Sequence, residues 1–190
     1  MSPVQKKFED YVYVLDYMAH GKAGGTWQSF RAEPLVQLIG ESFFTLLEAT
    51  PRSGDAISLC ERLYIGKDKL RDKITHIIGR ISYDDLTSTA KTELPLIVEA
   101  IIAKDVRQFV RFFNAAQAVT PRMHSLELIP GIGKKYSWAI LGAREKKLFE
   151  SFEDVKVRTG LPDPAKLIAK RVMEELTERA PKYRLFTRSS

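Results

Sequence analysis

The stretch Leu126–Arg144 constrains the fold of this chain most strongly, because it sets a Pro-Gly-Ile-Gly turn between two apolar runs of helical spacing. A Thr-Pro pair precedes it, and these residue types are typical of an N-cap and of the first residue of a helix. The sequence therefore predicts a short helix over Pro121–Leu128. Pro130 and Gly131 end that helix, and a second helix is predicted to begin near Gly133.

The turn and the runs beside it resemble the helix-hairpin-helix motif, which reads apolar-Pro-Gly-apolar-Gly with a small residue four positions on, here Ser137. The resemblance implies that the loop amides hold one phosphate of a nucleic-acid strand without reading bases, and that a monovalent cation can sit on the loop carbonyls. General chemistry agrees, because glycines let a backbone approach a flat partner and the first amides of a helix attract anions. The residues expected to bind phosphate are Pro130, Gly131, Ile132, Gly133, Lys134 and Lys135. The alternative is an ordinary corner between two helices with a glycine-rich bend.

Charge and composition favour a polyanionic partner, since the net charge is +6 and the sequence pI is near 9.4. At 44% hydrophobic and 28% charged residues the chain is typical of a globular protein, without the run of ~18 apolar residues that a membrane span needs. Its first residues also lack a signal-peptide core, so we expect a cytoplasmic protein that binds no membrane.

The cysteine and histidine content argues against a metal site. The single cysteine, Cys60, excludes an internal disulfide and a cysteine-rich zinc module, and its apolar surroundings predict that it is buried in a strand. The three histidines lie far apart in the sequence. We therefore expect neither a metal nor another cofactor, apart from the monovalent cation that the hairpin motif implies.

Residues 1–82 are predicted to form a small closed or nearly closed β-barrel like the oligonucleotide-binding (OB) fold. Turn residues separate five strand-like runs, which are Tyr11–Met18, Leu35–Gly40, Phe43–Thr50, Ile57–Ile65 and Arg71–Ile81, the last with Gly79 as a bulge.

The first of these strands offers candidate contacts to nucleic acid. Period-two alternation predicts that Tyr11, Tyr13 and Tyr17 share one face. Such a row stacks bases in many single-strand-binding barrels, whereas a half-buried row under a helix is the open alternative. The loop His20–Gly25 that follows lacks the Gly-Lys-Ser/Thr ending of a P-loop, which argues against a nucleoside triphosphatase, and its Lys22 is a candidate donor to phosphate.

From residue 83 the apolar period becomes helical. Residues 83–118 are predicted to be a helical connector with helices over Tyr83–Ala90, Lys91–Ala103 and Lys104–Ala116. Pro95 is tolerable only in the first turn of the second of these helices.

Residues 119–190 are predicted to form an all-α domain of two helix-hairpin-helix units, so that the chain as a whole is of the α+β class. The second unit comprises Phe149–Gly160 and Leu161–Leu176, with a serine or an aspartate before each helix as N-cap. It lacks the Gly-x-Gly loop. Lys166 and Lys170 are candidates for its phosphate contact, unless they only solvate a helix face.

The whole chain resembles an uncharacterised archaeal family that is described only as predicted to bind RNA or other nucleic acid. The resemblance rests on the segments YVYVLDYM, ERLYIGK, YDDLT, FVRFFN and LELIPGIGKK, which are spread over nearly the full length. It implies a barrel followed by a tandem helix-hairpin-helix domain in cytoplasmic translation or RNA metabolism, without an established activity. It favours RNA over DNA as the partner.

The chain is therefore expected to be a non-catalytic nucleic-acid-binding protein that grips phosphate without base specificity, and its sequence does not identify a protein partner. One alternative is a DNA-binding repair protein, a glycosylase or a nuclease, because such proteins carry similar hairpins. Asp154 and the pair Asp84-Asp85 are the acids to consider, but each lies where the first turn of a helix favours an acid. The other alternative is a protein-interaction adaptor, against which the intact Gly-x-Gly loop argues.

Overall fold

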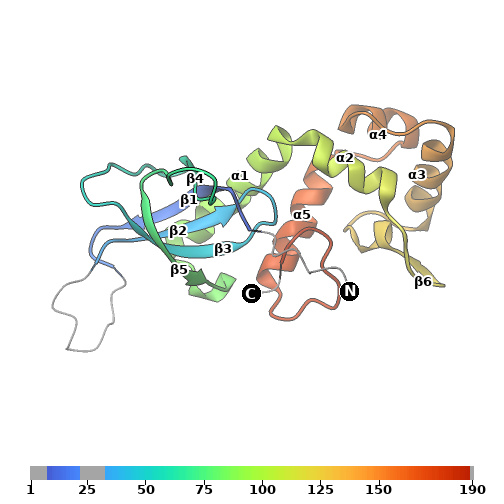
Figure 1. Ribbon diagram of the computed structural model, residues 1–190. Coiled ribbons are helices and arrows are strands. Elements are labelled where there is room, and N and C mark those ends of the chain that lie inside the picture. The colour runs from blue at the N-terminus through green and yellow to red at the C-terminus, as the bar shows by residue number, and fades with distance from the viewer. Residues whose placement is uncertain (1–7, 22–32, 189–190) are drawn as a thin grey trace, which may run out of the picture. The chain divides into compact units, whose positions relative to one another are not determined.

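The computed structural model describes residues 8–21 and 33–188, and the chain divides into two compact units (Figure 1). The first unit comprises Met1–Ile97 and Phe186–Ser190, and the second comprises Val98–Leu185. Within the described ranges, no helix is long and apolar enough to cross a membrane.

The first unit is built on one antiparallel sheet that curls into a half-barrel (Figure 1). Its strands are β1 (Tyr11–Met18), β2 (Leu35–Gly40), β3 (Leu46–Pro51), β4 (Arg62–Tyr64) and β5 (Ile74–Arg80). Their order in space is β4-β1-β2-β3-β5, so that β4 and β5 form the edges of the described sheet and leave a seam between them. The predicted α+β class with a curled sheet ahead of the helices is confirmed, but the sheet is half open instead of closed.

The concave face of the sheet holds an apolar core, because alternate residues of each strand point to it. Its buried members are Val12, Val14, Val36, Leu38, Leu47, Ala49, Leu63, Ile65 and Ile74. On the other face, the buried side chain of Gln37 joins the sheet to the segment that leads into α1 (Ser88–Lys104). Its Nε2 donates to Glu48 Oε1 and to the Asp85 carbonyl, each at 2.9 Å. Its Oε1 accepts from Thr87 N–H at 2.9 Å, so the amide is paired at both ends and fixes the start of the helix.

Strand β1 contains a β-bulge at the fully buried Leu15, because its register with β2 shifts just after Val14. An extra residue in one strand reverses the alternation of side chains beyond it. Tyr17 therefore lies on the face opposite Tyr11 and Tyr13. The prediction that all three tyrosines share one face is wrong, since a simple period-two count contains no bulge.

Positive backbone φ angles shorten two of the predicted strands. Phe44 has φ 52°, so β3 begins only after it. Cys60 has φ 61° and lies exposed in a turn, which confines β4 to the end of the predicted run Ile57–Ile65. The prediction of a buried cysteine is wrong, because a left-handed residue cannot continue a strand. The irregularity predicted at Gly79 is found beside it, because the register with β3 shifts between Ile77 and Gly79.

The predicted helix over Tyr83–Ala90 is wrong, because two successive polar caps divide that segment. Ser82 forms a capping box with the last residue of a short 3₁₀ helix, η1 (Tyr83–Asp85). Thr87 Oγ1 then accepts the Ala90 N–H at 3.0 Å and starts α1. The helix runs unbroken from there, so that Pro95 lies well beyond its first turn.

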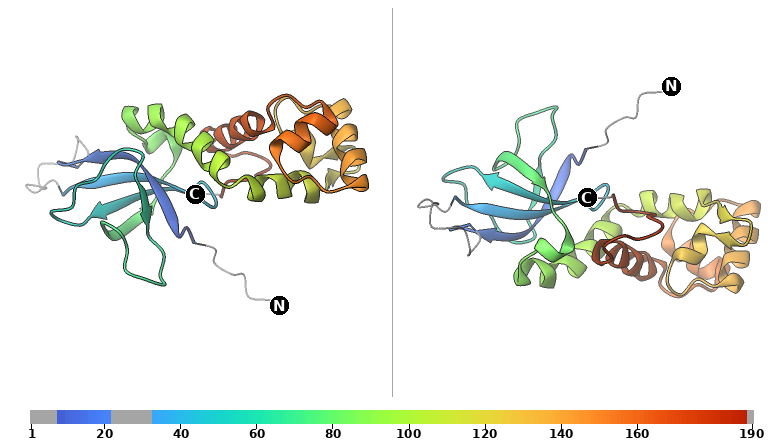
Figure 2. Two further views of the ribbon diagram at one scale, coloured as in Figure 1. Left: turned by 90° about the horizontal axis from the view of Figure 1, so that it is seen from above. Right: turned by 90° about the horizontal axis from the view of Figure 1, so that it is seen from below.

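The second unit consists of short helices and one small β-hairpin. Its elements are α2 (Val106–Ala115), β6 (Ala118–Thr120), β7 (Met123–His124), η2 (Ser125–Leu128), α3 (Lys134–Lys146), α4 (Phe152–Thr159) and α5 (Pro164–Thr177). Both views in Figure 2 show α3 and α4 as neighbours.

The helix predicted over Pro121–Leu128 is wrong, because its first residues form the turn and the second strand of the β6–β7 hairpin and only the 3₁₀ turn η2 remains. Ser125 fixes this arrangement, since its Oγ and its N–H both donate to the Gln117 carbonyl, at 2.7 and 3.0 Å. The predicted N-caps of the last two helices are confirmed. Ser151 Oγ accepts from the backbone of α4, and Asp163 Oδ1 accepts from that of α5.

Candidate nucleic-acid interface

The candidate phosphate-binding loop joins η2 to α3 and is anchored by a buried isoleucine. Ile132 is buried, and its N–H donates to the Ile129 carbonyl at 3.0 Å. The glycines on either side are both exposed. Gly131 has φ 92°, whereas Gly133 is the N-cap of α3 with φ −92° and ψ −172°. The loop therefore turns its apolar residue inward and leaves its two glycines at the surface.

The fold needs only one of these two glycines. Gly131 has a left-handed backbone, and a Cβ added to it would lie 3.2 Å from Leu167 Cδ2. A Cβ on Gly133 would meet no atom within 4 Å, and its φ is ordinary for any residue. What Gly133 lacks is a side chain to cap the first amides of α3. The N-cap of α3 therefore has no side chain, and the first N–H groups of the helix can donate to an external anion.

Of the two lysines that begin α3, one is engaged within the protein. Lys134 Nζ lies 2.9 Å from Glu127 Oε2 and donates to the Arg122 carbonyl at 2.7 Å, which ties α3 to η2. A hydrogen bond from the His124 N–H, followed by the one from Lys134, lowers the pKa of Glu127. Lys135 is exposed, and its Nζ is 5.9 Å from the centroid of the Tyr136 ring. Lys135 is thus the cation that this loop offers to solvent.

His124 stabilises the turn that precedes the loop, and it does so in its neutral form. Its Nδ1 accepts the Leu126 N–H at 3.2 Å at the start of η2. Burial lowers the pKa of His124, the positive charges of Arg144 and Lys134 act in the same direction, and Glu127 opposes them. An imidazolium cannot accept a hydrogen bond, so protonation weakens the turn that precedes the loop.

The loop between α4 and α5 follows the same plan but is closed by its own side chain. Gly160, with φ 71°, and the buried Leu161 take the places of the first glycine and the isoleucine. Asp163 Oδ1 accepts the Lys166 N–H at 3.2 Å, so a carboxylate of the chain already occupies the start of α5. The Nζ of Lys166 also lies 3.6 Å from Asp163 Oδ2. The candidate Lys170 is exposed on the same helix.

An exposed tryptophan beside the first loop is a feature that the sequence analysis missed. Trp138 is 70% exposed and lies one helical turn after Lys134. With Lys134 and Arg122 it lines a hollow of about 170 Å³. The available signal was its spacing, because an aromatic residue four positions after a lysine in the loop lies on the same helix face. An exposed ring among cations is a surface on which a base can stack.

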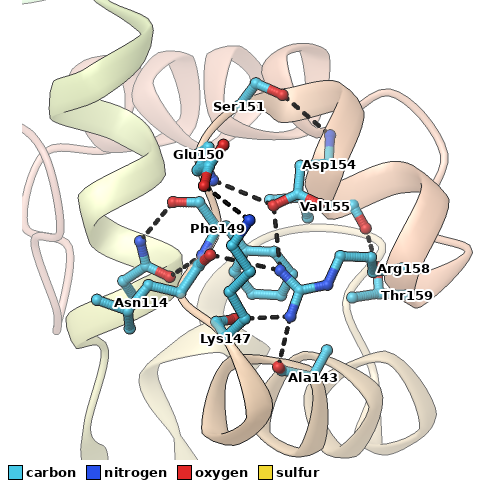
Figure 3. A network of polar contacts seen from close by, with 11 residues as sticks. Asn114, Ala143, Lys147, Phe149, Glu150, Ser151, Asp154, Val155, Arg158 and Thr159 are labelled. Atoms are coloured by element: carbon cyan, nitrogen blue, oxygen red, sulfur yellow. Dashed lines mark hydrogen bonds and ion pairs between the residues drawn. The ribbon is translucent and has the colours of Figure 1, made fainter.

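A network around Arg158 holds α3 and α4 together (Figure 3). Its guanidinium donates to the carbonyls of Ala143 and Lys147, both at 2.6 Å, and so caps the end of α3. The same group lies over the Phe149 ring, with Cζ 4.6 Å from the centroid. Asn114 exchanges two hydrogen bonds with the backbone of Phe149, at 2.8 and 2.9 Å.

Asp154, one of the acids considered above for catalysis, belongs to this network (Figure 3). Its Oδ2 accepts from the Glu150 N–H and from Arg158 Nη1, both at 3.1 Å. Burial alone would raise the pKa of Asp154. The two hydrogen bonds and the charges of Arg158 and Lys147 outweigh it and lower that pKa. The carboxylate is thereby committed to holding α4 in place.

The candidate contacts of the first unit are only partly open to a ligand. Tyr11 is half-buried, its ring meets that of Tyr64 edge-on at 5.3 Å, and Arg62 Cζ lies 3.5 Å from its centroid. A guanidinium thus already covers one face of this ring. Tyr13 is also half-buried. Lys22 lies outside the described residues.

The comparisons with known proteins agree on one family. The sequence model of a family described as "Protein of unknown function (DUF655)" matches residues 8–188. The chain is 45% identical to "Uncharacterized protein MJ0038" of Methanocaldococcus jannaschii over 184 residues, which cover 96% of this chain and 82% of that protein. It is also similar to the crystal structure of Af1531 from Archaeoglobus fulgidus, with a TM-score of 0.83 and 48% identity, covering 95% of this chain and 100% of that chain. The expected likeness to uncharacterised archaeal proteins is confirmed, and RNA binding is not part of these descriptions.

Proposed function

The chain belongs to the DUF655 family, and because that family's description assigns no activity, we propose a function from the geometry of the chain itself. The protein is a non-catalytic nucleic-acid-binding protein that holds the phosphate backbone without reading bases and prefers RNA to DNA. The loop from Pro130 to Lys135 makes the contact as a helix-hairpin-helix, and an OB-like half-barrel precedes it.

The contrast between the two loops of the second unit carries this proposal. Asp163 fills the start of α5 with a carboxylate of the chain, whereas Gly133 leaves the start of α3 without a side chain. Nothing in the packing or backbone of Gly133 requires glycine. A phosphate that takes the same position as the Asp163 carboxylate explains why a side chain is missing there. Lys135 adds charge beside it.

Two further observations favour a strand with unpaired bases. A tandem of hairpins touches both strands of a duplex only if both loops are open, and here the second is closed by Asp163. Trp138 is exposed on the same helix as the open loop and offers a ring to a base that is not already stacked in a helix. Single-stranded segments with splayed bases are the usual targets of RNA recognition, which supports the preference for RNA.

The acids that an enzyme of this kind would use are occupied by structural contacts. Asp154 Oδ2 accepts from Glu150 and Arg158. Asp85 Oδ2 accepts from the N–H and the Oγ of Ser82, at 2.9 and 2.6 Å. Both carboxylates cap short helices, which supports a binding role without catalysis.

Fluorescence anisotropy with labelled single- and double-stranded RNA and DNA tests the proposal. The variant to compare with the wild type is Gly133→Asp combined with Lys135→Glu. Lys134 is left unchanged, because its replacement by an acid would break its ion pair with Glu127 and destabilise the loop. Titrations at two salt concentrations separate phosphate contacts from other binding, since counterion release makes affinity fall with salt.

We expect the wild type to bind single-stranded RNA best and the variant to bind at least tenfold more weakly at low salt, with the same circular dichroism spectrum. Equal binding by the two proteins would show that this loop is not the phosphate site. If neither protein binds any of the four probes, the proposal of a nucleic-acid-binding protein is wrong.

A further inference from the structure

The half-barrel of the first unit has a pocket of about 250 Å³ along the seam between its edge strands. Leu47 of β3, Ile65 just after β4 and Ile77 of β5 line it with apolar surface. Leu47 and Ile65 belong to the buried cluster of the concave face, and Ile77 packs against that cluster. The pocket therefore opens from the seam onto the core of the half-barrel.

An arginine stands on this otherwise apolar face. Arg80 is the partner of Leu47 in the register of β3 with β5, and residues directly opposite each other share one face of a sheet. Arg80 also lines the pocket. A guanidinium at the edge of an apolar pocket can stack on a flat ring and can also donate two hydrogen bonds to a phosphate.

Positive charge dominates the rim of the pocket. Lys67, Arg71 and Arg188 line it together with Arg80. Among the described residues that line the pocket the one carboxylate is that of Glu9, and it is turned to the backbone. Its oxygens accept from the N–H groups of Ser42, Phe43 and Thr45, at 2.9, 3.0 and 3.2 Å. The Glu9 carboxylate is thus already hydrogen-bonded by three backbone donors, and the four cations that line the pocket outnumber its single negative charge.

The cationic rim continues into a second, more open hollow that shares Lys67 and Arg71 with the first. This hollow adds Arg52 and Lys69. Of the acids nearby, Asp55 pairs with Arg52, with Oδ2 3.7 Å from Arg52 Nη1, and Asp72 Oδ2 accepts the Tyr64 N–H at 2.9 Å. The two hollows together give an apolar pocket that leads onto a track of positive charge.

We propose that this seam binds a nucleotide, with the base in the apolar pocket and the phosphate on the cations of the rim. At about 250 Å³ the pocket is slightly smaller than typical ligand sites, which span roughly 300–1,000 Å³, and this size suits one ring system better than a long chain. The ligand is either a free nucleotide or one unpaired nucleotide of a strand, because both present the same ring and phosphate. The site lies in the first unit and does not depend on the loop of the second.

Isothermal titration calorimetry of the full chain tests this site with four nucleoside 5′-monophosphates, the matching nucleosides, pyrophosphate and a 5′-phosphorylated tetranucleotide. Ile77→Trp fills the pocket, and Ile78→Trp is its matched control, since Ile78 is the exposed neighbour on the same strand. Arg80→Glu reverses the charge at the rim without changing a buried residue. The Gly133→Asp, Lys135→Glu variant serves as the control for the other site.

We expect at least one monophosphate to bind tenfold or more tightly than its nucleoside and than pyrophosphate. Ile77→Trp and Arg80→Glu should each weaken that binding at least tenfold, whereas Ile78→Trp and the loop variant should leave it unchanged. A tetranucleotide that binds more tightly than any monophosphate, and loses this in Ile77→Trp, identifies a strand as the source of the nucleotide. Equal binding of pyrophosphate, equal effects of the two tryptophan variants, or no binding of any nucleotide probe would overturn the proposal.

Discussion

Replacing Gly133 by aspartate should strengthen the fold and weaken nucleic-acid binding at the same time. The backbone at this position is extended, with φ −92° and ψ −172°, as is typical of an N-cap, and a Cβ there meets no atom within 4 Å. The new carboxylate can therefore accept from the first turn of α3, just as Ser151 Oγ does from an extended backbone at the start of α4. An N-cap aspartate gains a few tenths of a kcal/mol over glycine, and its charge near the helix start adds about 0.3–1 kcal/mol.

The same carboxylate should exclude the phosphate that the wild type binds. Hydrogen bonds to a charged group contribute about 1.5–3 kcal/mol, so losing those of the α3 amides weakens affinity roughly ten- to a hundredfold. The plot of log affinity against log salt should also become flatter by about 0.7–0.9, because one phosphate contact is lost.

Urea denaturation gives the stability, and anisotropy with single-stranded RNA gives the affinity. Gly133→Asn is the matched control, because it caps the helix without a charge and should therefore stabilise less while binding better than the aspartate variant. A more stable Gly133→Asp protein that keeps full affinity and an unchanged salt slope would refute the phosphate site at α3. A loss of both stability and affinity would refute the assignment of an open N-cap.

Four further predictions concern stability. Gly131→Ala should cost about 1–2 kcal/mol in urea denaturation, because its φ of 92° is left-handed. Gly40→Ala should lower the free energy of unfolding by about 2–4 kcal/mol, since a Cβ there overlaps the Glu9 carboxyl and expels it from three N–H donors. Adding Glu9→Ala to this variant should then cost almost nothing more, and additive costs would contradict this coupling. The pKa of His124 is lower in the folded chain than the unfolded value of about 6.5, so the stability that neutral His124 contributes is complete above that pH and is lost on acidification. Hydrogen exchange of the amides in η2 at about pH 7.5 and 5.5 measures this loss. A His124→Gln variant should not show the pH dependence. Glu175 is 1% exposed, and its carboxylate accepts from Arg171 and from the Leu185 N–H. Glu175→Ala should therefore lower the free energy of unfolding by about 3 kcal/mol and expose the last residues to limited proteolysis. An unchanged digestion pattern would contradict this prediction.

Local chemistry made part of the fold predictable from the sequence. The alternation in Tyr11–Met18 and the apolar run of Leu35–Gly40 identified two strands with their observed bounds. Ser151 and Asp163 identified the starts of two helices, because an N-cap depends on a side chain and the next few amides. The glycine-rich turn of the first loop was predictable for the same reason, because such a turn depends on backbone geometry within a few residues.

The errors arose where contacts distant in sequence override local preference. Leu15 is bulged and fully buried, which reverses the side of Tyr17. Cys60 lies in a turn, and its N–H donates to the Val14 carbonyl, 46 residues earlier in the chain. The sequence also could not reveal that Lys134 pairs with Glu127, or that strand order brings Arg80 beside a pocket. Such features depend on which elements become neighbours, and residue spacing alone does not specify this.

The exposed turn that carries Cys60 makes this chain simple to label and to cross-link. Cys60 holds the only thiol of the sequence, so a fluorophore or spin label attaches at one known point in the first unit. Partial desolvation, followed by the hydrogen bond to Glu93, raises the pKa of this exposed thiol, which slows labelling near neutral pH and favours mildly alkaline conditions. Any disulfide formed between two copies must also join Cys60 to Cys60. A covalent dimer on a non-reducing gel would therefore report directly that two of these turns have met.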